Sequence, residues 1–195
     1  MKIIITTLLI CLWGAGIYAQ DLKPFKGENS KYGYKDATEK IVIIPKYDDV
    51  DKFSDGFAKV ALNDKIGLIN QKGKEIVSPK YDAIGNFSYG MAAVVLNNKL
   101  GFINTTGKEI VQMKYDLYEL CSKDDYKFSE GLASVSILDG DNYYLDVYKW
   151  GFIDKTGKEI IPLKYESVES FKNGKAKVYL DFREFYIDKT GKEVK

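Results

Sequence analysis

The chain has 195 residues, with 29 lysines and arginines against 28 aspartates and glutamates, and it contains no histidine. This balance argues against a nucleic-acid partner, which would require a basic surplus or stripe. The missing imidazole excludes Ser-His-Asp and Cys-His catalytic arrangements as well as histidine-based zinc sites. We therefore expect no cofactor, no metal ligands and no catalytic residues.

Residues 1–19 resemble a secretory signal peptide, because one positive charge precedes an apolar run that ends near Gly14. Ala19 is the small residue expected before the cleavage site. The apolar run is shorter than the roughly 20 residues that span a bilayer, which argues against a membrane anchor. A lipoprotein cysteine would need a small residue before it, but Ile10 precedes Cys11. We expect an exported protein of the periplasm, cell surface or extracellular space, with no membrane span after cleavage.

Loss of the leader removes one lysine and leaves 28 basic against 28 acidic residues, a net charge of zero. One cysteine remains, Cys121, so no internal disulfide is expected. The remaining 176 of the 195 residues are enough to bury a core without one. Residues 20–30 are polar and contain Pro24 and Gly27, which predicts a partly disordered spacer.

From residue 31 onward the chain is a tandem repeat. Its first glycines recur 34, 34 and then 50 residues apart, at Gly33, Gly67, Gly101 and Gly151. A Lys-Tyr-acid triplet keeps this spacing and starts at Lys46, Lys80, Lys114 and Lys164. A Phe-x-x-Gly turn also recurs once per unit, at Phe53, Phe87, Phe128 and Phe171, but extra residues in the third unit make its later steps 41 and 43 residues. The predicted units are 31–64, 65–98, 99–148 with insertions, 149–182 and a half unit, 183–195.

Alternating apolar residues within each unit predict β-strands, and argue against the helical hairpins that also repeat every 34 residues. In the clearest unit, strands are expected over 58–62, 66–69 and 74–77. Asn63-Asp64 between the first two suits a two-residue hairpin turn. Asn70 to Gly73 suits a type I turn that ends on a left-handed glycine. The predicted fold class is all-β, an open twisted array of antiparallel repeats, with a small closed propeller as the alternative.

The repeated motif resembles the bacterial WG repeat family, and the resemblance covers residues 31–195. It rests on Lys149-Trp150-Gly151-Phe152-Ile153-Asp154, followed by Gly157-Lys158-Glu159-Ile160 and by the two motifs above. Tyr32, Ile66 and Leu100 replace the tryptophan elsewhere. The resemblance implies an all-β repeat architecture, often in exported or envelope-associated proteins. It implies no catalytic activity and no site residues.

Most repeated residues are expected to be structural. Gly67, Gly101 and Gly151 predict positions where one backbone approaches another closely. One tyrosine recurs in each unit, and these rings are expected to seal neighbouring units against each other, with a stacked-ring groove as the alternative; they are Tyr47, Tyr81, Tyr115 and Tyr165.

A functional site is expected where the repeat is broken, because loops on a rigid scaffold tend to carry function. The third unit contains two insertions, one within Leu117–Lys127 and one over Asp139–Tyr148. In the second, acids alternate with aromatic residues beside the motif tryptophan, which is typical of glycan or peptide sites. The candidate ligand-binding residues are Asp141, Tyr143, Tyr144, Tyr148 and Trp150.

Two alternatives stay open for the second insertion. It can be a longer hairpin whose tip is merely tolerated. It can also bind calcium through Asp139, Asp141 and Asn142, although their spacing does not follow the twelve-residue calcium loop.

The leading functional hypothesis is an exported module at the cell envelope that binds a protein or a glycan. It predicts an exposed aromatic patch near Tyr143, Tyr144 and Trp150. A structural spacer array without a small ligand is the alternative, and it predicts that these rings are buried. A glycoside hydrolase needs only two carboxylates, so it is retained as a third hypothesis, but we expect the chain not to be an enzyme.

Overall fold

The computed structural model describes residues 22–118, 126–140 and 147–195, and these residues form eighteen β-strands. All strand pairs are antiparallel, and they form five sheets that follow one another along the chain. The predicted all-β class is confirmed. Within the described ranges there is no helix long and apolar enough to cross a membrane.

The five sheets are built in chain order. Sheet one contains β1 (Lys23–Lys26), β2 (Tyr32–Lys35) and β3 (Ile41–Tyr47). Sheet two contains β4 (Asp49–Val50), β5 (Phe57–Leu62), β6 (Lys65–Asn70) and β7 (Glu75–Tyr81). Sheet three contains β8 (Ala83–Ile84), β9 (Met91–Leu96), β10 (Lys99–Asn104) and β11 (Glu109–Asp116). Sheet four contains β12 (Leu132–Asp139), β13 (Val147–Asp154) and β14 (Glu159–Tyr165), and sheet five contains β15 (Ser167–Val168), β16 (Lys175–Leu180), β17 (Arg183–Asp188) and β18 (Glu193–Val194).

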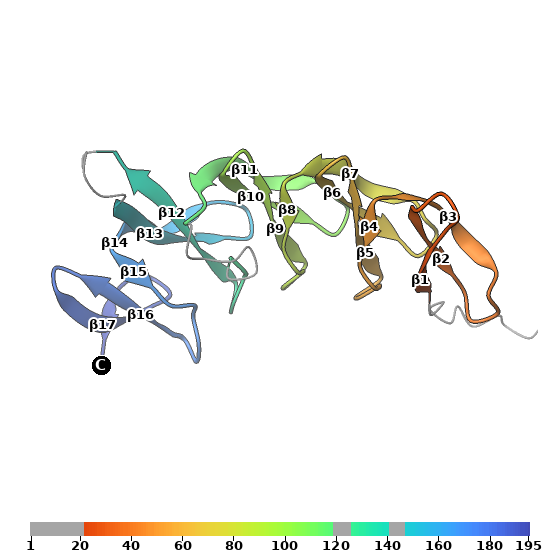
Figure 1. The fold of residues 1–195 in the computed structure, drawn as a ribbon. Coiled ribbons are helices and arrows are strands. Elements are labelled where there is room, and N and C mark those ends of the chain that lie inside the picture. Colours follow the sequence, from red (N-terminus) through yellow and green to blue (C-terminus); the bar gives the residue numbers. More distant parts are fainter. Residues whose placement is uncertain (1–21, 119–125, 141–146) are drawn as a thin grey trace, which may run out of the picture.

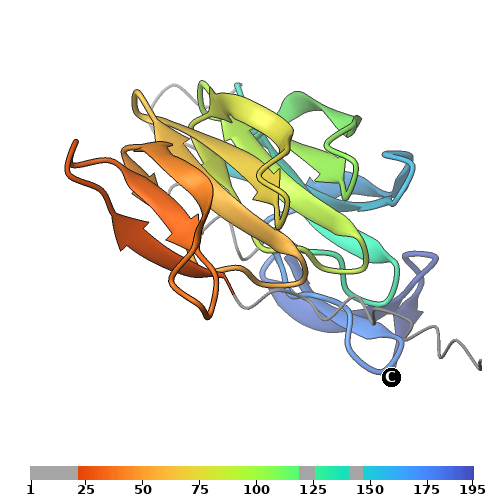
Figure 2. The same ribbon diagram turned by 90° about the vertical axis from the view of Figure 1, so that its right-hand side faces the viewer.

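The sheets form an open array. Figure 1 shows them side by side, with sheet one at one end and sheet five at the other. Figure 2, turned by a quarter, shows them one behind another. Consecutive sheets touch through their strands, for example β7 with β9 and β14 with β16. The predicted open array is therefore present, and the closed propeller is not.

The sheets do not coincide with the units read from the sequence. Sheets one, two and four end at the tyrosine of the Lys-Tyr-acid triplet and sheet three ends one residue beyond it, so the second sequence unit ends inside sheet three. The half unit 183–195 supplies β17 and β18 and thereby completes sheet five, whose other strands come from the unit before it. Strand pairing determines where each sheet begins and ends, whereas the residue chosen as the start of a sequence period is arbitrary.

The structure also differs from the expected spacer over residues 20–30. Lys23–Lys26 forms strand β1, in which Phe25 lies opposite Gly33. In sheet two, Val60 of β5 lies opposite Gly67 in the same way. Strand β1 is thus the counterpart of β5 in a shortened first sheet. Its sequence lacks the alternating alanine and valine that identify this strand in later units.

The predicted turns are confirmed. Asn63 and Asp64 have φ values of +51° and +60°, as a two-residue hairpin turn of type I′ requires. Gly73 has φ +75°, and its N–H donates to the carbonyl of Asn70 at 2.9 Å. Each such turn sets the register of its hairpin, so the apolar faces of successive strands align.

The core lies between the sheets. The four repeated tyrosines are almost fully buried, which confirms the packing interpretation and excludes the stacked-ring groove. Rings also meet across sheet boundaries, as Phe102 and Phe128 do with centroids 5.2 Å apart. Inner sheets are therefore covered on both faces. Sheet three packs Leu100 and Phe102 toward sheet four, and Ala92 and Val94 toward sheet two.

The outer face of sheet five is polar. Sheet three presents buried apolar residues to sheet four: Met91, Ala93, Val95, Leu100 and Phe102. Sheet five carries charged or hydroxylated residues at the corresponding places: Lys175, Lys177, Tyr179, Glu184 and Tyr186. Lys177 pairs with Glu184 at 3.3 Å across this outer face. Repeat arrays need such a polar terminal face for solubility.

We expect Gly101→Ala to lower the free energy of unfolding by about 1–3 kcal/mol, the usual cost of overpacking. A Cβ at Gly101 would lie 2.6 Å from the carbonyl oxygen of Val111 in the neighbouring strand. Chemical denaturation measures the change. Gly140→Ala is the control, because a methyl group added there would have no neighbour within 4 Å among the described residues. Equal losses in both variants would contradict the close-approach explanation.

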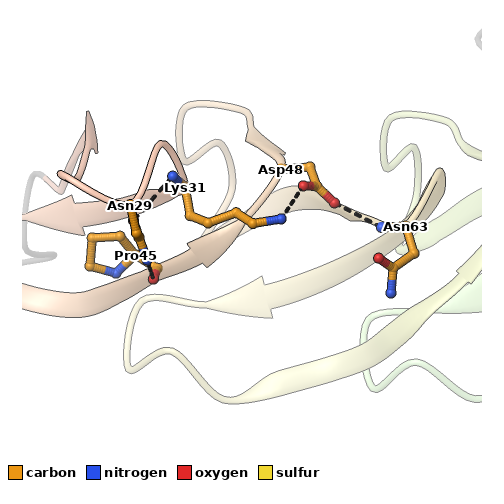
Figure 3. Close-up of polar contacts among 5 residues, drawn as sticks. All are labelled: Asn29, Lys31, Pro45, Asp48 and Asn63. Atoms are coloured by element: carbon orange, nitrogen blue, oxygen red, sulfur yellow. Dashed lines mark hydrogen bonds and ion pairs between the residues drawn. The ribbon is translucent and has the colours of Figure 1, made fainter.

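An acid at the end of each of the first three sheets joins that sheet to the next. Figure 3 shows Asp48, whose carboxylate accepts from the Lys31 ammonium and, at 2.8 Å, from the backbone N–H of Asn63. In the next unit Asp82 accepts from the Lys65 ammonium at 2.5 Å and from the backbone N–H of Asn97 at 2.6 Å. We call this arrangement the acid clasp; its third copy uses Lys99, Asp116 and the N–H of Leu138.

The acid clasps make the free energy of unfolding depend on pH in the acid range. The lysine partner and then the backbone N–H lower the pKa values of Asp48 and Asp82. Because these folded-state pKa values are depressed, the clasp contributes fully above the unfolded value of about 4, and its contribution is lost as the pH falls through the folded values.

We therefore expect Asp82→Asn to lower the urea unfolding midpoint at neutral pH and to flatten its decline under acid conditions. The midpoint is measured across the acid range. Asp64→Asn is the matched control, since Asn98 holds the same turn position one unit later. An unchanged acid profile in Asp82→Asn would contradict the role of the clasp.

Candidate ligand-binding groove

Two grooves occupy equivalent places in the array. One lies between sheets two and three, has a volume of about 270 Å³ and is lined by residues that include Ile66, Asp82 and Ile84. The other lies between sheets four and five, has a volume of about 1070 Å³ and is lined at the same repeat positions by Trp150, Glu166 and Val168. The repeat thus forms a narrow groove at one junction and a broad groove at another.

The difference follows from the interrupted third unit. In sheet two, the short strand β4 pairs with β5 and forms one wall of the narrow groove. Sheet four has no short first strand among its described residues. Residues from both sides of the first insertion line the broad groove in its place: Tyr118, Tyr126 and Lys127. We call this broad groove the aromatic groove.

One wall of the aromatic groove is a cluster of rings. Tyr126 stacks on Trp150, with centroids 5.9 Å apart and an interplanar angle of 13°. Tyr118 meets Trp150 edge-on at 5.9 Å and Tyr148 edge-on at 4.9 Å. The backbone N–H of Tyr118 donates to the Tyr126 hydroxyl at 2.8 Å, which ties the two sides of the first insertion together. Ring contacts and one hydrogen bond therefore hold this wall together.

The structure describes two of the five predicted site residues, Tyr148 and Trp150. Tyr148 and Trp150 both lie on β13 and line the groove. Trp150 is only 8% exposed, so its expected exposure is wrong. Its position is the one that Ile66 and Leu100 hold in earlier units, and Tyr118 and Tyr126 cover its ring.

The remaining candidates are not tested by the described residues. Asp141, Tyr143 and Tyr144 lie outside the described residues, as does Asn142 of the calcium alternative. Asp139 pairs with the Lys149 ammonium at 2.7 Å. Within the described ranges, no three acidic, cysteine or histidine residues gather as metal ligands.

Sequence reasoning missed the rim of the groove. Phe182 is 93% exposed and has φ +61°, and it lines the groove beside Asp181. Its turn joins β16 to β17 and matches the turns at Asn63-Asp64 and Asn97-Asn98. A bulky residue at positive φ is strained, and such residues gather at binding sites. Phenylalanine at a turn position that otherwise holds asparagine or aspartate was the available signal.

These features define a class of protein: an all-β repeat scaffold of stacked sheets, with a groove next to its interrupted third unit. Four stretches match the family described as WG containing repeat: residues 32–65, 66–99, 101–140 and 150–181. The matches cover more than half of the chain, which therefore belongs to this family. No curated protein matches the chain closely enough to count as a relative.

Proposed function

We propose that this chain is an exported bacterial interaction module that binds a ligand in the aromatic groove, at the cell envelope or outside the cell. One observation carries the proposal: the junction at the interrupted unit is a groove of about 1070 Å³ with an exposed ring on its rim. Its volume lies just above the range of roughly 300–1,000 Å³ that small-ligand sites occupy. Membership of a repeat family fits an interaction role.

A structural spacer array is the second candidate, and the burial of Trp150 favours it. A tryptophan that is covered by other rings stabilises the fold whether or not a ligand is bound. Phe182 argues in the other direction, because an exposed ring at positive φ costs stability and packs nothing that a spacer would need.

A carboxylate-dependent hydrolase has less support. A general acid in such an enzyme needs a raised pKa. Among the described residues, every carboxyl group whose pKa departs clearly from its ordinary value is shifted downward. The main cause is a hydrogen bond to a lysine or threonine side chain, joined by backbone N–H groups at all of these acids except Glu75: Asp36, Asp48, Glu75, Asp82, Glu130, Asp154 and Asp188. These acids are suited to holding the fold together rather than to proton transfer.

Replacing the rim ring tests the binding proposal. We expect Phe182→Asn to lose ligands retained from envelope and culture-supernatant extracts, and to gain about 1 kcal/mol of stability, because asparagine tolerates positive φ better than phenylalanine does. Retention is measured by pull-down with the chain from residue 20 onward, and stability by denaturation.

Tyr89→Asn is the matched control for that experiment. Tyr89 is 59% exposed with φ +52°, and the corresponding turn two sheets later holds Asn173. It does not line the aromatic groove. Equal retention by the wild-type chain and both variants would remove the groove from the proposal. Retention of nothing by any of them would favour the spacer array.

Export is tested separately. Expression of the full chain in a bacterium is expected to give a processed protein that begins at Gln20, found outside the cytoplasm, because residues 1–19 carry the features of a cleaved leader. Cell fractionation and N-terminal sequencing measure this. An unprocessed chain that stays in the cytoplasm would contradict the envelope assignment and leave groove binding to be judged by the pull-down.

A further inference from the structure

We propose that the ligand of the aromatic groove is a neutral glycan, whose sugar ring stacks on Phe182 while its hydroxyl groups donate to the Glu166 carboxylate. This inference rests on the proposed function and specifies the ligand chemistry of the same groove. Three observations carry it: an open acid clasp, an exposed ring beside it, and a balance of charge in the lining.

The acid clasp is open at the junction of sheets four and five. Glu166 holds the position of Asp82, and its carboxylate accepts from the backbone N–H of Asp181 at 3.2 Å. The lysine of this unit, Lys149, pairs instead with Asp139 at 2.7 Å across the β12–β13 hairpin. Among the described residues no ammonium group pairs with Glu166. An exposed carboxylate with free acceptor positions therefore faces the groove.

The exposed ring of Phe182 lines the same groove as this carboxylate. The hydrogen bond to Glu166 comes from Asp181, the residue next to Phe182, so the acid and the ring belong to one rim. Adjacent sugar hydroxyls can both donate to a carboxylate, and the apolar C–H face of the same sugar can lie on an aromatic ring. In the proposed complex one sugar makes both contacts.

The charge of the lining points to a neutral ligand. With Lys149 already paired, Lys127 and Lys164 balance Glu166 and Asp181 among the described lining residues. A polyanion bound in the groove would be repelled by the two acids, and a polycation would be repelled by the two lysines. Hydroxyl groups of Ser134, Ser167 and Ser170 line the remaining groove and can both donate and accept. Such a mixed lining suits a ligand that is rich in hydroxyl groups.

The shape of the site favours a glycan over a protein partner. A stable protein interface buries roughly 800 Å² on each partner. The aromatic groove is a concave site between two sheets, and its volume of about 1070 Å³ is suited to a short chain of small rings. A single protruding peptide segment remains an outcome that the experiment separates.

Titration calorimetry with defined oligosaccharides tests the inference. The neutral probes are hexamers of glucose with β-1,4 and with α-1,4 linkages, of mannose and of N-acetylglucosamine, and the charged probes are hexamers of galacturonate and of glucosamine. We expect at least one neutral hexamer to bind at millimolar concentration or below. We expect Glu166→Gln to weaken that binding by about tenfold or more, since a charged hydrogen-bond acceptor is lost, and Phe182→Asn by about threefold to tenfold.

Asp82→Asn is the matched control for Glu166→Gln, because Asp82 holds the equivalent position in a closed clasp. It should leave saccharide binding unchanged. Failure of every neutral hexamer to bind, or stronger binding of a charged hexamer, overturns the glycan assignment. If Phe182→Asn still loses a protein ligand from the extracts, the groove remains a binding site and only its ligand class was wrong.

Discussion

Burial of both faces of every inner sheet is the constraint on which the rest of this structure depends. A sheet of three or four short strands cannot hide two apolar faces by itself, so each one needs a neighbour on either side. The four buried tyrosines and the ring contacts between sheets meet this need. The acid clasps then fix how neighbouring sheets sit, because each joins a carboxylate of one sheet to a backbone N–H in the next.

Much of this scaffold can be predicted from sequence because its causes are local. Turn chemistry identified the hairpins, as at Asn63-Asp64, and the repeated glycines marked close backbone approaches. The frame of the sheets could not be predicted, since strand pairing and not the sequence period decides it. Strand β1 was missed because its four residues carry little of the repeat pattern.

The candidate site was harder to predict, because it depends on residues that break the repeat pattern and on their contacts with residues distant in the sequence. The interrupted unit pointed to Tyr148 and Trp150, which line the broad groove. The sequence could not show that rings from the other insertion cover Trp150. Nor could it show that Lys149 turns toward Asp139, since the usual partner position is still occupied by an acid, Glu166. The repeat spacing of Lys149 and Glu166 is unchanged, so nothing in the sequence indicated that their ion pair is replaced by the one between Lys149 and Asp139.

The charged outer face of sheet five has a consequence for how such a chain can evolve. A new unit added after the last residue would meet Lys177 and Glu184 where it needs an apolar surface, so it could not stack. A duplication inside the gene would instead insert one repeat period between two apolar sheet faces. A sheet that the insertion splits would recover its full set of strands, because the inserted period carries equivalent ones. Arrays of this kind should therefore lengthen from within, while their last sheets are inherited unchanged.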